Sequence, residues 1–250
     1  LVDGKYGVTV AGVRKFGEGF IDGTFTDAWA YYGAATYAIS SKNRLDFFAF
    51  GAPQRHGQNL YRQNIGAYDQ DFAAGLDSYD QAAFGKYNEA GRYFNQNWAP
   101  VTGYSADGNV GSNTVKRNDS GKLWERENFY HKPQDNLNWY SQLSDKMLLT
   151  TVAYYSGGTG GGTGTLGSSV VREGFNGQSP WFNNAPYTID WNAVIDRNEG
   201  NADGARTIIR NSRNNQTTLG AISKLKMEIS EPLTVEVGLD WRTATIEHYR

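Results

Sequence analysis

The sequence lacks cysteine, and it is poor in hydrophobic residues for its length. Without a thiol, a disulfide-stapled fold and a thiolate metal site are both excluded. The hydrophobic share is 39%, below the roughly 45–50% of ordinary globular domains. Aromatic residues make up 14% and glycine supplies 30 residues, so rings carry much of the apolar surface. Such a composition suits the aromatic girdles of membrane barrels, and it also suits sugar-binding surfaces.

The chain also lacks a charge imbalance and a long apolar run. A net charge of −2 leaves no excess of basic residues for binding nucleic acid, which we therefore do not expect as a partner. No window approaches the roughly 18 apolar residues of a membrane helix, whereas a membrane strand needs only about 9–11. The 250 residues could form one large or two ordinary domains. Because the chain starts at Leu1 and ends at Arg250 within a strand pattern, we expect part of a longer protein.

Catalytic and metal-binding motifs are missing as well. The three histidines lie far apart with no HExxH pattern, at positions 56, 131 and 248. No Gly-Lys-Ser/Thr follows the glycine-rich run 157–167, so that run predicts a flexible loop and not a phosphate loop. Asp77 and Asp80 could form a hydrolase pair, but such pairs are common in loops. The sequence therefore predicts no enzyme, no metal site and no cofactor.

The most informative stretch is 128–162, which has the pattern of two long strands joined at Ser144-Asp145-Lys146. Side chains alternate between the two faces of a strand. On the first strand one face is apolar, with Phe129, Leu137, Trp139 and Leu143; the other is amide-rich, with Lys132, Gln134, Asn136, Asn138 and Gln142. A soluble sandwich exposes a charged face, whereas a run of amides is also typical of the wet interior of a large membrane barrel.

About seven strands are predicted in all. Their approximate ranges are 5–14, 28–40, 44–51, 128–144, 147–156, 216–229 and 233–249. Long outer loops are expected at about 52–124 and 157–214, with a short helix within 71–93. The strands exceed the usual 5–6 residues, and Pro133 would stand at the outer rim, about 10 residues from the turn.

Short and long connections alternate along these strands. An antiparallel barrel with short periplasmic turns and long extracellular loops has this alternation. The predicted fold class is therefore all-β: a segment of an antiparallel transmembrane β-barrel. Since the smallest known barrels have about eight strands, we do not expect this segment to close on its own.

Three motifs resemble the barrel of TonB-dependent outer-membrane receptors. They are the run from Phe129 through HKPQ and LNWY to GGTGGG, the early GFIDGTFTDAWAYY followed by GAPQRHGQ, and the C-terminal VEVGLDWRTATIEHYR. The resemblance spans nearly the whole chain, residues 1–250. Such receptors are plugged barrels of about 22 strands. This chain shows neither the plug domain nor a TonB box, so the resemblance implies a partial barrel.

The resemblance implies a function in active transport across the bacterial cell outer membrane. The expected ligand is scarce: a siderophore, cobalamin or a glycan. The expected partners are TonB and the receptor's own plug domain, both outside this chain, together with outer-membrane lipid. Two other interpretations stay open, a soluble all-β carbohydrate-binding module and a fragment of a β-rich glycoside hydrolase.

Two sets of side chains are candidates for function. Polar residues on one strand parity are expected to face the lumen: Asn136, Asn138, Gln142, Lys224, Glu236, Asp240 and Arg242. Aromatic residues of the outer loops are expected to contact ligand: Tyr93, Phe94, Trp98, Trp181, Phe182 and Trp191. The first set could equally be the solvated face of any half-buried sheet, and the second could pack the loops against each other.

Overall fold

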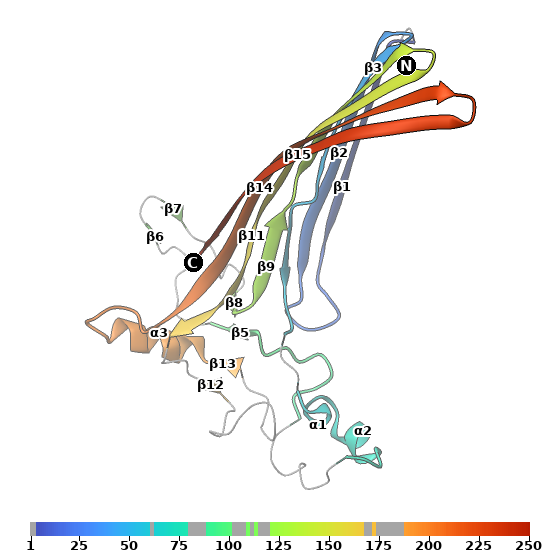
Figure 1. Cartoon of the computed structure of the whole chain (residues 1–250). Helices are drawn as coiled ribbons and strands as arrows, with labels where there is room; N and C mark the ends of the chain where they lie inside the picture. The colour runs from blue at the N-terminus through green and yellow to red at the C-terminus, as the bar shows by residue number, and fades with distance from the viewer. Residues whose placement is uncertain are drawn as a thin grey trace.

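The computed structural model describes residues 4–60, 63–79, 89–101, 109–110, 113–114, 121–167, 172–173 and 188–250. One large antiparallel sheet dominates it (Figure 1). The strands of this sheet are β1 (Tyr6–Gly17), β2 (Thr26–Ser40), β3 (Asn43–Gly51), β4 (Gln54–Gly57), β9 (Glu127–His131), β10 (Gln134–Ser144), β11 (Met147–Gly167), β14 (Thr207–Ser230) and β15 (Leu233–Tyr249). The predicted all-β antiparallel fold is confirmed.

The strands lie side by side in chain order. β3 and β4 share one register against β2, and β9 and β10 share one register against β11, so each pair is a single interrupted strand. The sheet is therefore a seven-strand meander, as the sequence predicts. Among the described residues β1 pairs only with β2 and β15 only with β14, which leaves the sheet open at both edges.

Two prolines cause the interruptions. Proline has no N–H to donate to a ladder. Pro53 separates β3 from β4, and Pro133 separates β9 from β10. The carbonyl oxygens of both prolines still accept hydrogen bonds from the strands on their other side. Trp29 N of β2 donates to Pro53 O at 2.8 Å, and Gly157 N of β11 donates to Pro133 O at 2.9 Å. The hydrogen-bond ladder is therefore interrupted between the strand formed by β3 and β4 and the strand formed by β9 and β10. This is the position, at Pro133, where the sequence predicts the outer rim of the sheet.

All three short turns lie at one end of the sheet (Figure 1). They join β2 to β3, β10 to β11 and β14 to β15. The long connections and the helices lie at the other end, and these helices are α1 (Ile65–Tyr68), α2 (Gln70–Ala74) and α3 (Trp191–Glu199). In the part of the chain that is described, no helix is long and apolar enough to cross a bilayer.

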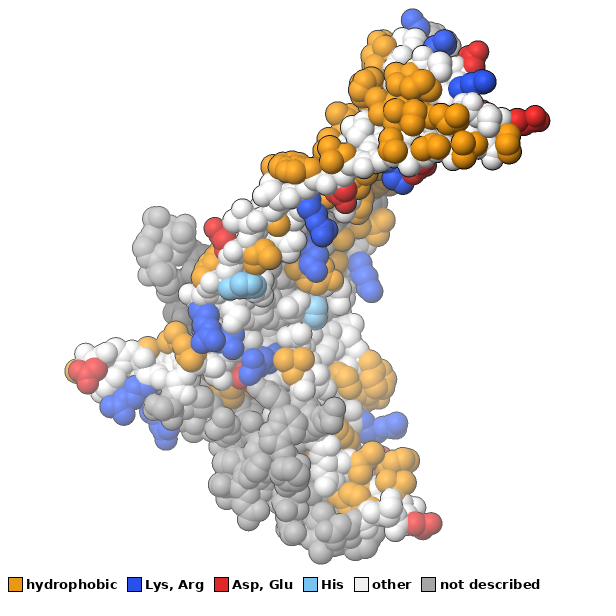
Figure 2. All heavy atoms as spheres, in the orientation of Figure 1, with side chains coloured by type: hydrophobic (Ala, Val, Ile, Leu, Met, Phe, Trp, Pro, Cys, Tyr) orange, Lys and Arg blue, Asp and Glu red, His pale blue; other side chains and the backbone are white. Residues whose placement is uncertain are grey.

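The register gives the sheet two chemically different faces. Paired residues on one face are mostly hydrophobic, as in the row Val8, Ala35, Phe47, Leu137, Ala153, Ala221 and Trp241; we call this the apolar face. The opposite face, here the polar face, carries amides and charges such as Asn138 beside Asp46 and Lys226 beside Glu236. Val8 and Leu239 are 77% and 71% exposed, so no second layer covers the apolar face at these positions. Figure 2 shows hydrophobic side chains gathered near the short turns.

The long connections contain more regular structure than the sequence predicts. The expected loop 52–124 includes β4, which extends the sheet, and the short strands β5 (Trp98–Pro100), β6 (Asn109–Val110), β7 (Asn113–Thr114) and β8 (Lys122–Trp124). The expected loop 157–214 includes β12 (Arg172–Glu173), β13 (Thr188–Ile189) and α3. The helix expected within 71–93 is α2, which begins at Gln70 because the Asp69 side chain accepts a hydrogen bond from Phe72 N at 2.8 Å.

The glycine run 157–167 is strand, and the expectation of a flexible loop there was wrong. It belongs to β11, which pairs with β14 on one side and with β9 on the other. Glycine has a low strand propensity, which is why local sequence argues against this assignment. Here the absence of side chains permits close approach, since a Cβ on Gly161 would overlap the backbone oxygen of Ser212.

Gly161→Ala should therefore destabilise the sheet by about 1–3 kcal/mol, the usual cost of overpacking. Gly158→Ala is the matched control, because its Cβ would have its nearest neighbour, Gln216 Cβ, at an ordinary 3.7 Å. Urea unfolding of the full-length protein, followed by tryptophan fluorescence, measures both. Equal unfolding midpoints for the two variants would contradict the crowding at Gly161.

Candidate functional site

A hollow of about 510 Å³ lies on the polar face where β9, β11, β14 and β15 meet. Its floor is Gly158, Gly160 and Gly162, which alternate along β11 and so share this face. Because three successive positions on this face of β11 lack side chains, a channel about one side chain deep is left between the flanking strands. We call this hollow the glycine trough.

Polar side chains form the two walls of the glycine trough. One wall comes from β9 and the residue after it, with Asn128, Tyr130 and Lys132. The other comes from β14 and β15, with Ser212, Asn214, Gln216, Ile246 and His248. Every polar wall residue can donate or accept a hydrogen bond, and none of the described residues that line the trough is a carboxylate.

Contacts within the walls hold several of these side chains in place. The Lys132 ammonium lies 5.2 Å from the centre of the Tyr130 ring, which keeps the cation beside the hollow. His248 Nδ1 is hydrogen-bonded to Asn214 Oδ1, and Asn128 Nδ2 donates to Gly161 O at 3.1 Å. The trough therefore presents one fixed cation and several amide donors, an arrangement that suits an anionic ligand with oxygen acceptors.

The candidate lumen residues all lie on the polar face. Asn136 and Asn138 pair with Phe48 and Asp46 of β3, and Lys224 Nζ is 3.0 Å from Glu236 Oε1. Gln142 donates to Ser144 O at 2.6 Å, so it also fastens the turn. Asp240 and Arg242 pair with Ile222 and Gly220. The structure thus brings the seven residues onto one face, on the turn side of the glycine trough.

The candidate ligand-binding rings do not form one platform. Tyr93 packs edge-on against Phe20 with ring centres 4.8 Å apart, and Trp98 lies under the Lys122 ammonium at 5.0 Å. Phe94 is half-buried. Trp191 is 4% exposed in a core with Ala99, Val101, Ile189 and Val194, which is the loop-packing arrangement. Trp181 and Phe182 lie outside the described residues.

The glycine trough was not singled out from the sequence. The signal was nevertheless present, because the spacing of Gly158, Gly160 and Gly162 is that of one strand face. The alternation of these glycines has no meaning in a loop, and a loop was the structure predicted for this run. The pairing that brings Asn214 and His248 beside these glycines spans more than 50 residues of chain, and no local pattern encodes it.

Other candidate chemistry finds little support among the described residues. No group of three or more histidine, aspartate or glutamate side chains could hold a metal ion in this part of the chain. Asp77 is exposed, and Asp80, its suggested partner, lies outside the described residues. His131 Nε2 is hydrogen-bonded to Tyr31 Oη at 2.9 Å, so this histidine has a partner within the sheet.

Comparison with known proteins gives a likeness in fold alone. No family model matches the chain, and no curated protein matches it either. Two solved structures of the ferric-catecholate import receptor Fiu from E. coli K12 are similar. The closed form aligns with a TM-score of 0.51 at 10% identity, and the open form with 0.54 at 8%.

The fold of this chain is similar to part of these receptor chains. The two alignments cover 98% of this chain but only 28% and 31% of the receptor chains. The chain therefore spans about three tenths of the length of the proteins it resembles. The receptor-like barrel fold expected from the three sequence motifs is confirmed at this coarse level.

Proposed function

We propose that this chain forms part of the barrel wall of a TonB-dependent import receptor in a bacterial outer membrane. The observation that carries this proposal is the two-faced register of the seven-strand meander. Hydrophobic side chains occupy one face of long neighbouring strands and stay exposed, as lipid-facing residues do. The short turns then belong to the periplasmic end, and TonB and a plug domain are partners outside this chain.

In this proposal the polar face lines the wet interior. Asn136, Asn138, Gln142, Lys224, Glu236, Asp240 and Arg242 then contact the plug or the ligand path. The glycine trough lies nearer the long loops, at the outer end of that path, because its floor belongs to the half of β11 farther from the short turn. Its place fits the first capture of ligand, with Tyr93, Phe94 and Trp98 as further contacts in the loops. No bond is made or broken by this chain.

A siderophore-type ligand is the one that the trough favours. Lys132 and the amides of the walls suit an anion rich in oxygen acceptors, and a ferric catecholate complex is such an anion. The similar receptor Fiu is itself an importer of ferric catecholate. Cobalamin and a neutral glycan are the competing ligands in the binding test below, because neither needs a cation such as Lys132 for its recognition.

The soluble carbohydrate-binding module is not favoured. Such a sandwich would bury the hydrophobic face against a second sheet. The three other sheets of the described structure have only two strands each, and Val8, Leu239 and Trp241 stay exposed.

Filling the glycine trough tests the proposed function. Gly158→Leu should fold, because an added Cβ meets nothing closer than 3.7 Å, yet its side chain would occupy the hollow. We expect ferric catecholate to bind the full-length variant about tenfold more weakly or worse, corresponding to a steric cost of about 1–3 kcal/mol. Tryptophan fluorescence titration of the purified receptor, with cobalamin and an oligosaccharide as parallel ligands, measures this.

Gly33→Leu is the matched control. Gly33 lies on the apolar face, and nothing stands within 4 Å of an added Cβ. It should bind ferric catecholate like the unmodified receptor. Equal binding by Gly158→Leu and the unmodified receptor would remove the trough from the ligand path, and binding of cobalamin or oligosaccharide alone would reassign the ligand.

A further inference from the structure

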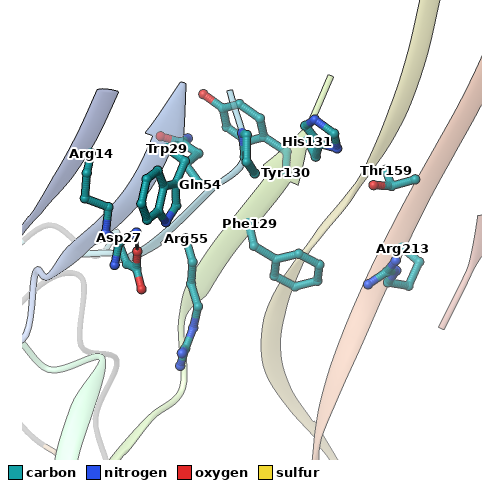
Figure 3. A pocket seen from close by; sticks show the side chains of 11 residues that line it. Arg14, Asp27, Trp29, Gln54, Arg55, Phe129, Tyr130, His131, Thr159 and Arg213 are labelled. Atoms are coloured by element: carbon teal, nitrogen blue, oxygen red, sulfur yellow. Dashed lines mark hydrogen bonds and ion pairs between the residues drawn. The ribbon is translucent and has the colours of Figure 1, made fainter. Parts of the chain in front are cut away.

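His248 is the one histidine of this chain that borders the glycine trough. The chain has three histidines, and all three lie among the described residues. His131 is on the apolar face, where it borders a separate hollow (Figure 3) and is hydrogen-bonded to Tyr31. His56 lies on β4 and pairs with Asn128, outside the lining of the trough. Since histidine is the side chain that changes its charge between about pH 5 and 8, His248 can make the trough respond to pH.

The hydrogen bond to Asn214 determines which nitrogen of the His248 ring carries the proton. Asn214 Oδ1 can only accept a hydrogen bond, so His248 Nδ1 carries the hydrogen of this contact. In the neutral ring the other nitrogen, Nε2, is then an acceptor, whereas in the charged ring both nitrogens are donors. The nitrogen that is left for a ligand therefore changes from an acceptor to a donor when the ring takes up a proton.

The groups around His248 do not supply a negative charge within the trough. Lys132 and Tyr130 are the other titratable side chains among the described residues of its lining, and neither is a carboxylate. Arg250 follows His248 by two residues and adds a further cation. Glu247, the carboxylate next to His248 in the chain, lies on the opposite, apolar face by its register. A positive charge on His248 is therefore matched by a bound anion and not by a carboxylate of the lining.

Lys132 and His248 stand on opposite walls of the trough. Three strand spacings separate β9 from β15, which places these walls roughly 14 Å apart at about 4.8 Å per spacing. The glycine floor between them leaves room for a compact ligand that touches both walls. An oxygen-rich anion meets a permanent cation on the Lys132 wall. On the His248 wall it meets either an acceptor nitrogen, which repels its oxygens, or a charged donor, which binds them.

We propose that His248 couples the capture of an anionic ligand in the glycine trough to the uptake of a proton. The inference rests on the proposed function, because it concerns the same hollow and the same oxygen-rich ligand. Only the charged ring donates from Nε2, and an anion beside the ring favours that charged form. Affinity should therefore be highest at acidic pH and should fall as the pH rises through the range in which histidine loses its proton. A neutral ligand gains less from the charge, so the same contact selects for an anion.

The test measures how tightly the full-length receptor binds a catecholate complex at two pH values. The probe is the chromium(III) tris-catecholate complex, because chromium(III) exchanges its ligands slowly and the complex keeps its charge in mild acid. Tryptophan fluorescence titration of the purified receptor gives the Kd at about pH 5.5 and about pH 8, on either side of the range in which histidine titrates. The unmodified receptor should bind about tenfold more tightly at the lower pH, the usual effect of gaining a hydrogen bond from a charged group.

Two substitutions of His248 separate the proton from the shape of the side chain. His248→Gln keeps a hydrogen-bond donor but does not titrate, so it should bind the probe equally at both pH values, at the weaker level of the unmodified receptor at about pH 8. His248→Lys carries a positive charge at both pH values and should bind tightly at both. His56→Gln is the matched control, since His56 lies on the polar face but outside the trough, and it should keep the tenfold effect of pH.

The outcomes distinguish this inference from the proposed function. Equal binding at both pH values by the unmodified receptor, or a pH effect that survives in His248→Gln, overturns the proton coupling and leaves the ligand assignment standing. Weaker binding by both His248→Gln and His248→Lys at both pH values makes His248 a structural residue and also overturns the coupling, as does loss of the pH effect in His56→Gln. A folded receptor that binds no probe at either pH overturns the proposed ligand, and the proton coupling with it.

Discussion

Leu225→Arg should block assembly of the full-length receptor in the membrane. Leu225 pairs with Leu149 on one side and Val237 on the other, all on the apolar face. If this face contacts lipid, a guanidinium there must enter hydrocarbon, at about 2–4 kcal/mol near the middle of the bilayer. Urea unfolding in lipid vesicles measures the change in free energy, and the heat-dependent gel mobility of the outer-membrane fraction measures assembly.

The control for Leu225→Arg is the neighbouring residue on the other face. Lys224 forms an exposed ion pair with Glu236, which contributes under about 1 kcal/mol. Lys224→Gln should therefore assemble normally. Equal tolerance at positions 224 and 225 would remove the assignment of the two faces, and with it the receptor function.

Trp191→Ala should unfold the loop assembly while leaving the sheet intact. Trp191 is 4% exposed and packs with Ala99 and Val101 from the β4–β9 connection and with Ile189 and Val194 from its own connection. Truncation of a buried tryptophan costs about 3–5 kcal/mol. Among the described residues this core joins two connections that are far apart in sequence, so its loss should free both.

Hydrogen exchange of the full-length protein measures this effect. Amide protection should fall in β5 and α3 and stay unchanged in the paired centre of β11 and β14. Ile208→Ala is the control, because Ile208 is 48% exposed and lies next in sequence to Ile209, which packs against the same core; its truncation should change stability by under about 0.5 kcal/mol. Unchanged protection in α3 of Trp191→Ala would show that the two connections are held by other contacts.

The strands were predictable where their two faces differ in chemistry. β15 begins and ends where the alternation of Leu233, Val235, Val237 and Leu239 with polar neighbours predicts. β3 was also placed well, although Phe47, Phe48 and Phe50 blur its alternation. Its start followed from the tight turn predicted at residues 41–43, which is a local signal. In the structure Pro53 follows its end.

The strand ends near the loops were not predictable in the same way. β14 begins at Thr207, nine residues before the expected start, and β11 continues through the glycine run to Gly167. Both extensions exist because each strand supplies the hydrogen-bonding partner of the other. Polar residues and glycine both have a low intrinsic preference for strands, so the local sequence did not predict either extension.

The sequence by itself determined the meander, its short turns at one end and the division into an apolar and a polar face. Those features follow from alternation with a period of two and from turn residues, which are local properties of a chain. Only the tertiary structure decided that Gly158, Gly160 and Gly162 floor a trough, that Trp191 is a core residue and that His248 borders the trough. These features depend on which distant strands pair and in which register, and cross-strand register is a property of the assembled sheet.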